Sequence, residues 1–270
     1  MMAEFDRNIA VVTGAADGIG QATSVMLAAR GARVLLVDID DDRLTATENQ
    51  IIDAGGQARA HLADVTDAAQ VRGYVETALD TFGPIDAFFN NAGIQGPVGR
   101  ITEFPEDGFD QVIAVNLRGV FLGLKYVLPG MVERRQGSVV NTASMGAVGG
   151  VPGVAGYVAA KHGVLGLTKT AALEVADTGV RVNAVLPGNI RTKLAAAGDA
   201  AIRSGGPSLD NMSGPAATVP QGRIGEPGEI AATVCFLVSD DSQHITGAAV
   251  PVDGGITAQV YPQVYTQANS

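Results

Sequence analysis

The sequence predicts an α/β fold in which residues 1–270 form one domain, with a doubly wound parallel sheet and helices on both faces. Short apolar runs alternate with helical patterns and short links along the chain, the order that parallel sheets require because each crossover carries a helix. The chain has 270 residues, 46% of them hydrophobic, so it can bury one large core. No internal repeat or low-complexity linker indicates a second domain.

The charge balance excludes some classes of partner. The net charge is −10 and the pI is about 4.7, whereas nucleic acids and anionic membranes select basic patches. The N-terminus lacks an apolar signal core, and charges such as Lys125 interrupt the longest apolar runs. We therefore expect a cytoplasmic protein with no nucleic-acid partner and no membrane partner.

Cysteine and histidine usage argues against a disulfide and against a metal site. Cys235 is the only cysteine, and its apolar neighbours predict a small buried side chain. The three histidines, at positions 61, 162 and 244, are scattered along the chain. We expect no bound metal.

The first predicted strand, Ile9–Thr13, runs into a glycine-rich turn before a helix at 21–30. Glycines at 14, 18 and 20 allow the backbone to approach a pyrophosphate, and the helix N-terminus supplies N–H donors, with Ile19 among them. This predicts that Gly14, Gly18, Ile19 and Gly20 bind a dinucleotide. A glycine turn without a ligand is the alternative.

The second predicted strand, Arg33–Asp38, ends in an acid eighteen residues after Gly20. An acid at this place grips the adenosine ribose diol in NAD-binding folds and repels the 2′-phosphate of NADP. Asp17 adds a second negative charge beside the same pocket. We therefore expect NAD as the cofactor. The alternative for Asp38 is a cap on the helix predicted at 40–54.

Two further strand ends carry candidate cofactor residues. After a strand at 57–63, Asp64 is placed to accept from the adenine amino group and Val65 to form an apolar wall, although Asp64 could equally cap a helix at 67–82. After a strand at 85–90, Asn91, Ala92 and Gly93 are expected first to tie neighbouring loops together and then to line the cofactor.

The catalytic candidates lie on the next three elements. Asn116 is a polar amide inside an apolar helix predicted at 107–135, where it can open the helix locally and hold a water through its backbone carbonyl. A strand at 138–142 leads to Ser144. A helix at 154–176 carries Tyr157 and Lys161, whose spacing places both side chains on one face.

This spacing suggests an acid–base pair. A free phenol has a pKa of roughly 10, and a neighbouring ammonium is expected to lower it by about 1–3 units. Ser144 lies beyond a glycine-rich bend that can bring its hydroxyl to the phenol, where it would hold a substrate oxygen. The outer apolar residues of the helix could contact a partner subunit or face the sheet.

The last third of the chain completes the site. A strand at 180–186 is followed by Pro187 and Gly188, after which the Ile190 backbone and the Thr192 hydroxyl are placed to hold a carboxamide. Residues 193–222 are predicted to form a lid over the site. A helix at 226–238, a strand at 248–252 and a polar tail at 256–270, a candidate subunit contact, finish the chain.

Together these motifs resemble the short-chain dehydrogenase/reductase family, in its single-domain branch of ~250 residues. The resemblance covers residues 9 to about 257 and rests on the following segments: T-G-A-A-D-G-I-G, Asp38, Asp64-Val65, N-N-A-G, Asn116, Ser144, Y-V-A-A-K, P-G-N-I-R-T and D-G-G. Within the family, three segments are similar to the levodione reductase branch and to cyclic-alcohol and dihydrodiol dehydrogenases. These segments are F-F-N-N-A-G-I, V-N-L-R-G-V-F-L-G-L-K-Y-V-L and V-V-N-T-A-S.

The resemblance implies a Rossmann-type sheet of about seven parallel strands, a homotetramer and a catalytic tetrad. Tyr157 would be the general acid/base, Ser144 would hold the substrate oxygen, and Asn116 would support a proton-relay water. Lys161 would lower the tyrosine pKa and, with Tyr157, contact the nicotinamide ribose. Asp17 departs from the family, which often has Ser or a basic residue there, and this weakens the case for NADP.

The sequence thus predicts an NAD-dependent enzyme that interconverts a secondary alcohol and its ketone. Apolar and small residues at 145–154 favour an uncharged cyclic or aromatic substrate, although Arg191 and Lys193 lie close by. The alternatives are a 3-oxoacyl reductase of fatty-acid type and a nucleotide-binding scaffold without catalysis.

Overall fold

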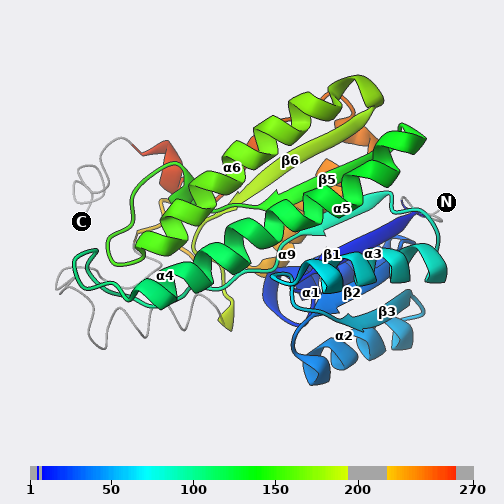
Figure 1. Ribbon diagram of the computed structural model, residues 1–270, viewed down its shortest axis with the longest axis horizontal. Helices are drawn as coiled ribbons and strands as arrows, with labels where there is room; N and C mark the ends of the chain where they lie inside the picture. Colours follow the sequence, from blue (N-terminus) through cyan, green and yellow to red (C-terminus); the bar gives the residue numbers. More distant parts are fainter. Residues whose placement is uncertain (1–4, 6–7, 194–217, 260–270) are drawn as a thin grey trace.

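The computed structural model describes Phe5, residues 8–193 and residues 218–259. Seven parallel strands form one sheet in the order β3-β2-β1-β4-β5-β6-β7 (Figure 1). The strands are β1 (Ile9–Thr13), β2 (Arg33–Asp38), β3 (Gln57–Leu62), β4 (Ala87–Asn90), β5 (Gly137–Thr142), β6 (Val180–Pro187) and β7 (Ala249–Val252). The expected Rossmann-type sheet is confirmed.

Helices cover both faces of the sheet (Figure 1). The α-helices are α1 (Gly18–Ala29), α2 (Asp41–Asp53), α3 (Ala68–Thr81), α4 (Glu106–Ile113), α5 (Gly119–Arg134), α6 (Ala155–Val175) and α9 (Pro227–Val238). A π-helical segment, η1 (Ala114–Arg118), joins α4 to α5. Short 3₁₀ turns are η2 (Met145–Ala147), η3 (Ala176–Thr178), η4 (Asp240–Ser242) and η5 (Ile256–Ala258).

The core consists of two apolar clusters, one on each face of the sheet. One cluster packs α3, α5 and α6 against the sheet, and the other packs α1, α2 and α9. Along β1, Val11 joins the first cluster, whereas Ala10 and Val12 join the second. Successive side chains of a strand point to opposite faces, so strands buried on both faces have continuous apolar sequences.

The outer apolar residues of α6 face the core. Of the outer residues predicted, Leu165, Ala171, Ala172 and Val175 are buried in the first cluster and Leu167 packs against it, as the sheet-facing alternative predicts. Leu173 is the exception, with 81% of its surface exposed.

A helix can be long and apolar enough to cross a membrane by length and composition alone while serving as a core helix of the fold. The continuous helical stretch Glu106–Arg134 meets that criterion by length and composition, with a mean hydropathy of 1.4 in its most apolar window. In this fold the apolar residues Leu122, Leu124 and Val127 of that stretch are buried in the first cluster. They pack against other parts of the chain.

The strand order reverses between β1 and β4, and this point positions the site. β1 pairs with β2 on one side and with β4 on the other, so the crossovers on either side leave in opposite directions. In doubly wound sheets the crevice at the carboxyl ends of such strands is the usual ligand site.

Candidate active site

The glycine turn after β1 is packed too closely for side chains at two positions. Gly14 has φ +68°, and a Cβ there would lie 2.8 Å from Nδ2 of Asn91. A Cβ on Gly20 would lie 1.9 Å from the Gly14 carbonyl oxygen, which seats the first turn of α1 directly on the loop. The α1 N-terminus therefore opens onto a backbone surface without side chains, as phosphate cradles require.

Asn91 holds this turn from the neighbouring strand. Its side chain donates to the Thr13 carbonyl (3.0 Å), and its backbone N–H donates to Thr13 Oγ1 (2.9 Å). Its side-chain oxygen accepts from Thr142 Oγ1 (3.0 Å). Asn90 donates to the Val120 carbonyl (2.9 Å). These bonds confirm that the two asparagines tie neighbouring loops together, and Ala92 and Gly93 follow in the same crevice.

Asp38 lies at the end of β2 and faces the glycine turn. Its Oδ2 accepts from the Ala16 N–H (3.0 Å), and its Oδ1 accepts from the N–H groups of Ile39 and Asp40 (2.7 and 3.2 Å). The cap of α2 is Asp40, which accepts from the Arg43 N–H (3.2 Å). Asp38 is thus oriented by three amides, and Oδ2 keeps capacity to accept from a hydroxyl.

Asp64 forms a local turn rather than a helix cap. Its Oδ1 accepts from the Thr66 N–H (2.8 Å), whereas Asp67 caps α3 through Ala69. Val65 is 8% exposed, and a Cβ on Gly119 would lie 3.0 Å from its Cγ2. The capping alternative for Asp64 is therefore wrong.

The catalytic candidates meet at the carboxyl ends of β4 and β5. Ser144 is 8% exposed and Lys161 is 3% exposed. Tyr157 is half-buried, and its phenol lies close enough to Ser144 for the serine hydroxyl to act to lower the pKa of Tyr157. The Lys161 ammonium donates to the Thr142 carbonyl (2.7 Å) and lies 5.6 Å from the centre of the Tyr157 ring.

The expectation that Lys161 lowers the tyrosine pKa is wrong for this arrangement. Burial raises the pKa of Tyr157 above its ordinary value, and the hydrogen bond with Ser144 offsets only part of this rise. Burial also lowers the pKa of Lys161 to about 8. Desolvation disfavours the charged form of each group. The ammonium is directed to the Thr142 carbonyl.

Asn116 is fully buried at the centre of the π-helical segment. Its Oδ1 accepts from the Ile94 N–H and its Nδ2 donates to the Ile94 carbonyl, both at 2.8 Å. The predicted local opening of the helix is confirmed. A Cβ on Gly93 would lie 3.2 Å from Asn116 Oδ1 and 3.6 Å from Lys161 Nζ, so the amide and the ammonium flank the same glycine.

The segment after β6 reaches back to the glycine turn. Gly188 packs so closely on Asp253 that a Cβ would lie 2.6 Å from its Cα. Ile190 is 6% exposed and pairs in a β-bridge with Gly225. Thr192 Cγ2 lies 3.1 Å from the Cβ position of Gly18. Pro187 ends β6, and residues 194–217 of the expected lid and 260–270 of the tail lie outside the described residues.

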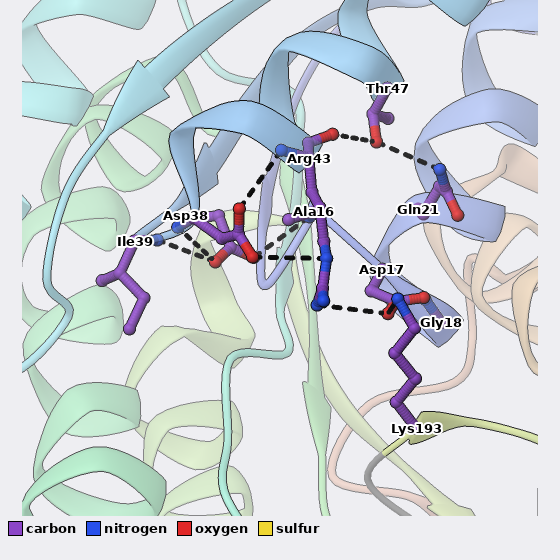
Figure 2. Close-up of polar contacts among 10 residues, drawn as sticks. Ala16, Asp17, Gly18, Gln21, Asp38, Ile39, Arg43, Thr47 and Lys193 are labelled. Atoms are coloured by element: carbon purple, nitrogen blue, oxygen red, sulfur yellow. Dashed lines mark hydrogen bonds and ion pairs between the residues drawn. The ribbon is translucent and has the colours of Figure 1, made fainter.

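Sequence reasoning missed two partners of Asp17. Asp17 caps α1 by accepting from the Gly18 N–H (2.7 Å), and it forms ion pairs with Arg43 (3.7 Å) and Lys193 (2.9 Å). Figure 2 shows both cations converging on this carboxylate. The position of Arg43 in the first turn after Asp40 hinted at a local pair, but no pattern in the sequence linked the three separate segments.

Among the described residues no group of three or more His, Cys, Asp or Glu could hold a metal.

Comparison with protein families and curated proteins gives a consistent result. A family model described as enoyl-(acyl carrier protein) reductase matches residues 14–257. Levodione reductase of Leifsonia aquatica is 42% identical over 94% of this chain and 96% of its own length. Cyclohexanol dehydrogenase of an Acinetobacter species is 40% identical over 96% and 98%. A 3-oxoacyl-(acyl-carrier-protein) reductase of Thermotoga maritima is 38% identical over 93% and 98%.

Solved structures show the same fold with either nicotinamide cofactor. The crystal structure of levodione reductase superimposes with a TM-score of 0.89 at 41% identity, over 95% of this chain and all of the other. The TM-score is also 0.89 for an NAD⁺-bound xylitol dehydrogenase, which is 36% identical over 93% of this chain and all of its own. It is again 0.89 for an actinorhodin polyketide ketoreductase variant with NADPH, which is 34% identical over 96% of this chain and all of its own.

Proposed function

This chain belongs to the short-chain dehydrogenase/reductase family, and from that premise we propose that it is an NAD-dependent oxidoreductase that interconverts a secondary alcohol and its ketone. The observation that carries the proposal is the paired hydroxyls of Ser144 and Tyr157 beside the buried Lys161. The glycine turn and Asp38 share the same edge of the sheet.

The described residues fit a nicotinamide dinucleotide. Glycines at 14, 18 and 20 keep side chains away from the backbone at the α1 N-terminus, where a diphosphate would bind, because a side chain there would collide with Asn91, Thr192 or the loop itself. Asp38 would accept from the adenosine ribose, Asp64 and Val65 would flank the adenine, and Ile190 and Thr192 would hold the carboxamide. When bound, oxidised NAD supplies the hydride acceptor and a positive charge beside the phenol.

Ser144 would hydrogen-bond to the substrate oxygen, and Tyr157 would exchange a proton with it. Ser144 Oγ accepts from the Gly146 N–H (3.1 Å), so its own O–H can donate, to the Tyr157 oxygen in the free enzyme and to the oxygen of the alcohol or ketone when the substrate binds. In oxidation Tyr157 would pass its own phenol proton to the relay water and take the alcohol proton; in reduction it would donate its phenol proton to the ketone oxygen and be reprotonated through the relay. Both hydroxyls lie among protein atoms, where a hydrogen bond to developing negative charge is worth more than in water.

Lys161 and Asn116 support the proton transfer. A pKa of about 8 leaves the Lys161 ammonium mostly protonated at neutral pH, so it keeps a positive charge below the Tyr157 ring. Asn116 fixes the Ile94 backbone beside Gly93 with two hydrogen bonds, and the interrupted helix there leaves carbonyls that can hold a relay water.

The charges near the site support an uncharged substrate. Arg191 pairs with Glu226 (2.8 Å) and Lys193 pairs with Asp17 (2.9 Å), so neither cation is free for a substrate carboxylate or phosphate. The segment after Ser144 carries Val148, which is 56% exposed, and Val151 lies on the Ser144 side of Gly146. An apolar wall of this kind suits a cyclic or aromatic alcohol.

The competing function is reduction of a 3-oxoacyl group with NADPH, favoured by the likeness to the Thermotoga reductase and to the NADPH-bound ketoreductase. The deciding experiment measures kcat/KM with NAD and NADP across cyclic, aromatic and acyl-chain alcohols. We expect NAD to be preferred and a cyclic or aromatic alcohol to be the best substrate. Preference for NADPH with 3-oxoacyl thioesters would replace our proposal with this one.

We also propose that the protein is a cytoplasmic homotetramer. Exposed apolar side chains on three helices, Phe121 of α5, Leu173 of α6 and Phe236 of α9, support subunit contacts. Light scattering coupled to size exclusion tests the assembly, and fractionation of cells tests the location. A monomer at micromolar concentration would contradict the first proposal.

A further inference from the structure

Asp17 receives two cations from opposite sides of the cofactor crevice. Arg43 comes from the first turn of α2, and Lys193 comes from the segment that follows β6. Partial burial acts to raise the pKa of Asp17, but hydrogen bonds from Lys193 and the Gly18 N–H and the charges of both cations outweigh it, so this pKa is below its ordinary value. The Oδ2 atom of Asp17 is shielded from solvent and lies 2.9 Å from Lys193 Nζ and 3.7 Å from Arg43 Nη1, so the two cations compensate its charge.

Arg43 spans the gap between the adenosine side of the crevice and Asp17. Its Nε lies 3.4 Å from Asp40, whose N–H donates to Asp38, and its Nη1 lies 3.7 Å from Asp17. Figure 2 shows the guanidinium between the Asp38 turn and the glycine turn. The bond from the Ala16 N–H to Asp38 crosses the same gap. Two parallel links therefore join these turns, one through Asp38 and one through Arg43.

The placement of Arg43 matters because of what a guanidinium binds. Its fork of N–H donors matches phosphate oxygens better than an ammonium does. Arg43 is next to the carboxylate proposed to hold the ribose diol, which is the part of the cofactor that carries the 2′-phosphate in NADP. Its side chain is 52% exposed and can move once it is released.

We propose that Asp17 contributes to the cofactor preference through Arg43: together with Asp40, its ion pair engages the guanidinium that would otherwise bind the 2′-phosphate of NADP. This inference rests on the proposed NAD-dependent function and adds a residue to it. Asp38 repels the phosphate by its own charge, whereas Asp17 occupies the Arg43 guanidinium, which could otherwise pair with the phosphate. Lys193 does not have this role, because it approaches Asp17 from the β6 side and touches no residue of the Asp38 turn in Figure 2.

The test is a double-mutant cycle on cofactor binding. Dissociation constants of NADH and NADPH are measured by fluorescence of the reduced nicotinamide for the wild type, Asp17→Asn, Arg43→Gln and the double variant. Asparagine keeps the helix cap, because Asn and Asp cap equally well, so the fold is preserved. Asp42→Asn in the first turn of α2 is the matched control, with the same change of charge.

We expect Asp17→Asn to tighten NADPH binding about tenfold and to leave NADH binding within about threefold, the size of one charge-assisted phosphate contact. The gain should vanish in the double variant and persist when Lys193→Gln is added to Asp17→Asn. A gain that survives Arg43→Gln, or that Asp42→Asn reproduces, would overturn the inference. A wild type that binds NADPH more tightly than NADH would instead overturn the proposed function, so the two failures are distinguishable.

Discussion

The two ends of the crevice use charge in different ways. At the catalytic end, Lys161 is 3% exposed and its ammonium is fixed by a backbone carbonyl at 2.7 Å. At the adenosine end, the side chains of Arg43 and Lys193 are 52% and 67% exposed and contact carboxylates. The first arrangement depends on exclusion of water, whereas the second depends on charges that water and salt weaken.

This difference separates the residues proposed to transfer a proton from the residues proposed to select the cofactor. Groups that must transfer a proton are buried, because desolvation shifts their pKa values and strengthens their hydrogen bonds. Groups that choose between two cofactors can remain at the surface, because a difference of one phosphate is large even in a screened environment. Substitutions at the two ends should therefore differ in size and in their response to pH and salt.

The largest expected effect is that of Tyr157→Phe. Loss of the phenol removes the proton acceptor, so kcat should fall about a thousandfold or more for every alcohol. NADH binding should change by less than about threefold, since one hydroxyl contact is lost from many. Steady-state kinetics and fluorescence titration measure the two quantities.

The matched control is Tyr126→Phe, which removes a phenol that pairs with Arg72 on the surface of α5. It should leave kcat within a factor of about two. Comparable turnover in Tyr157→Phe and Tyr126→Phe would show that Tyr157 has no part in the mechanism. The distinction between the catalytic end and the adenosine end of the crevice would then be wrong.

Lys161→Met should lower kcat about a hundredfold and change the pH dependence of stability. The pKa of Lys161 is about 8 in the folded chain, below its ordinary value, so the unfolded state binds more protons as the pH rises above 8. The free energy of unfolding of the wild type should therefore rise by about 2 kcal/mol from this group between pH 8 and 10. Below pH 8 the amine is charged in both states and the full cost of its burial is present.

Chemical denaturation at pH 7.5, 8.5 and 9.5 should show this rise in the wild type and its loss in Lys161→Met. Lys169→Met, at an exposed position of the same helix, is the control and should keep the wild-type slope. Parallel curves for the wild type and Lys161→Met would mean that Lys161 is hydrated and that the catalytic end resembles the other end.

Asp38→Ala should reduce the ratio of kcat/KM with NAD to that with NADP about tenfold. The substitution removes both the acceptor for the ribose and the repulsion of a 2′-phosphate. It also frees the Ala16 N–H, so NADH should bind more weakly as well. An unchanged ratio, determined with a single alcohol and both cofactors, would show that the ribose contact is misassigned.

A change of salt concentration should give the smallest effect of these tests, and it should distinguish the exposed ion pairs at the adenosine end from the buried groups at the catalytic end. Between about 0.05 and 0.5 M salt, the NADPH gain of Asp17→Asn should shrink several-fold, because its charges are exposed. The kcat of the wild type should change by less than about twofold, because Lys161 is buried. Equal salt sensitivity of both quantities would contradict the distinction between the two ends.

Much of the fold follows from local patterns in the sequence. Continuous apolar strands such as Arg33–Asp38 and the regular alternation of elements predict the sheet, and the element bounds agree within a few residues. The meeting of Ser144 with Tyr157 was predictable because a glycine-rich bend separates them. Asn116 was predictable as a helix interruption because an amide in an apolar helix competes for backbone partners.

The rest depends on distances that no local pattern encodes. The Tyr157 pKa was predicted in the wrong direction because desolvation is set by the whole environment, and the sequence shows only the neighbouring amine. The approach of Arg43 and Lys193 to Asp17 joins three segments across the crevice. These contacts form only when the sheet is assembled, and the residues next to Arg43 and Lys193 in the sequence do not predict them.

The hydrogen bonds from Asn91 to Thr13 have a consequence for how the protein is made. β1 leaves the ribosome early, yet its glycine turn acquires this support only from a residue 78 positions later. Nascent chains stalled before β4 should therefore leave NADH fluorescence unchanged, and longer ones should begin to enhance it. The turn between β1 and α1 therefore reaches its native hydrogen bonding only after β4 has been synthesised and has docked beside β1.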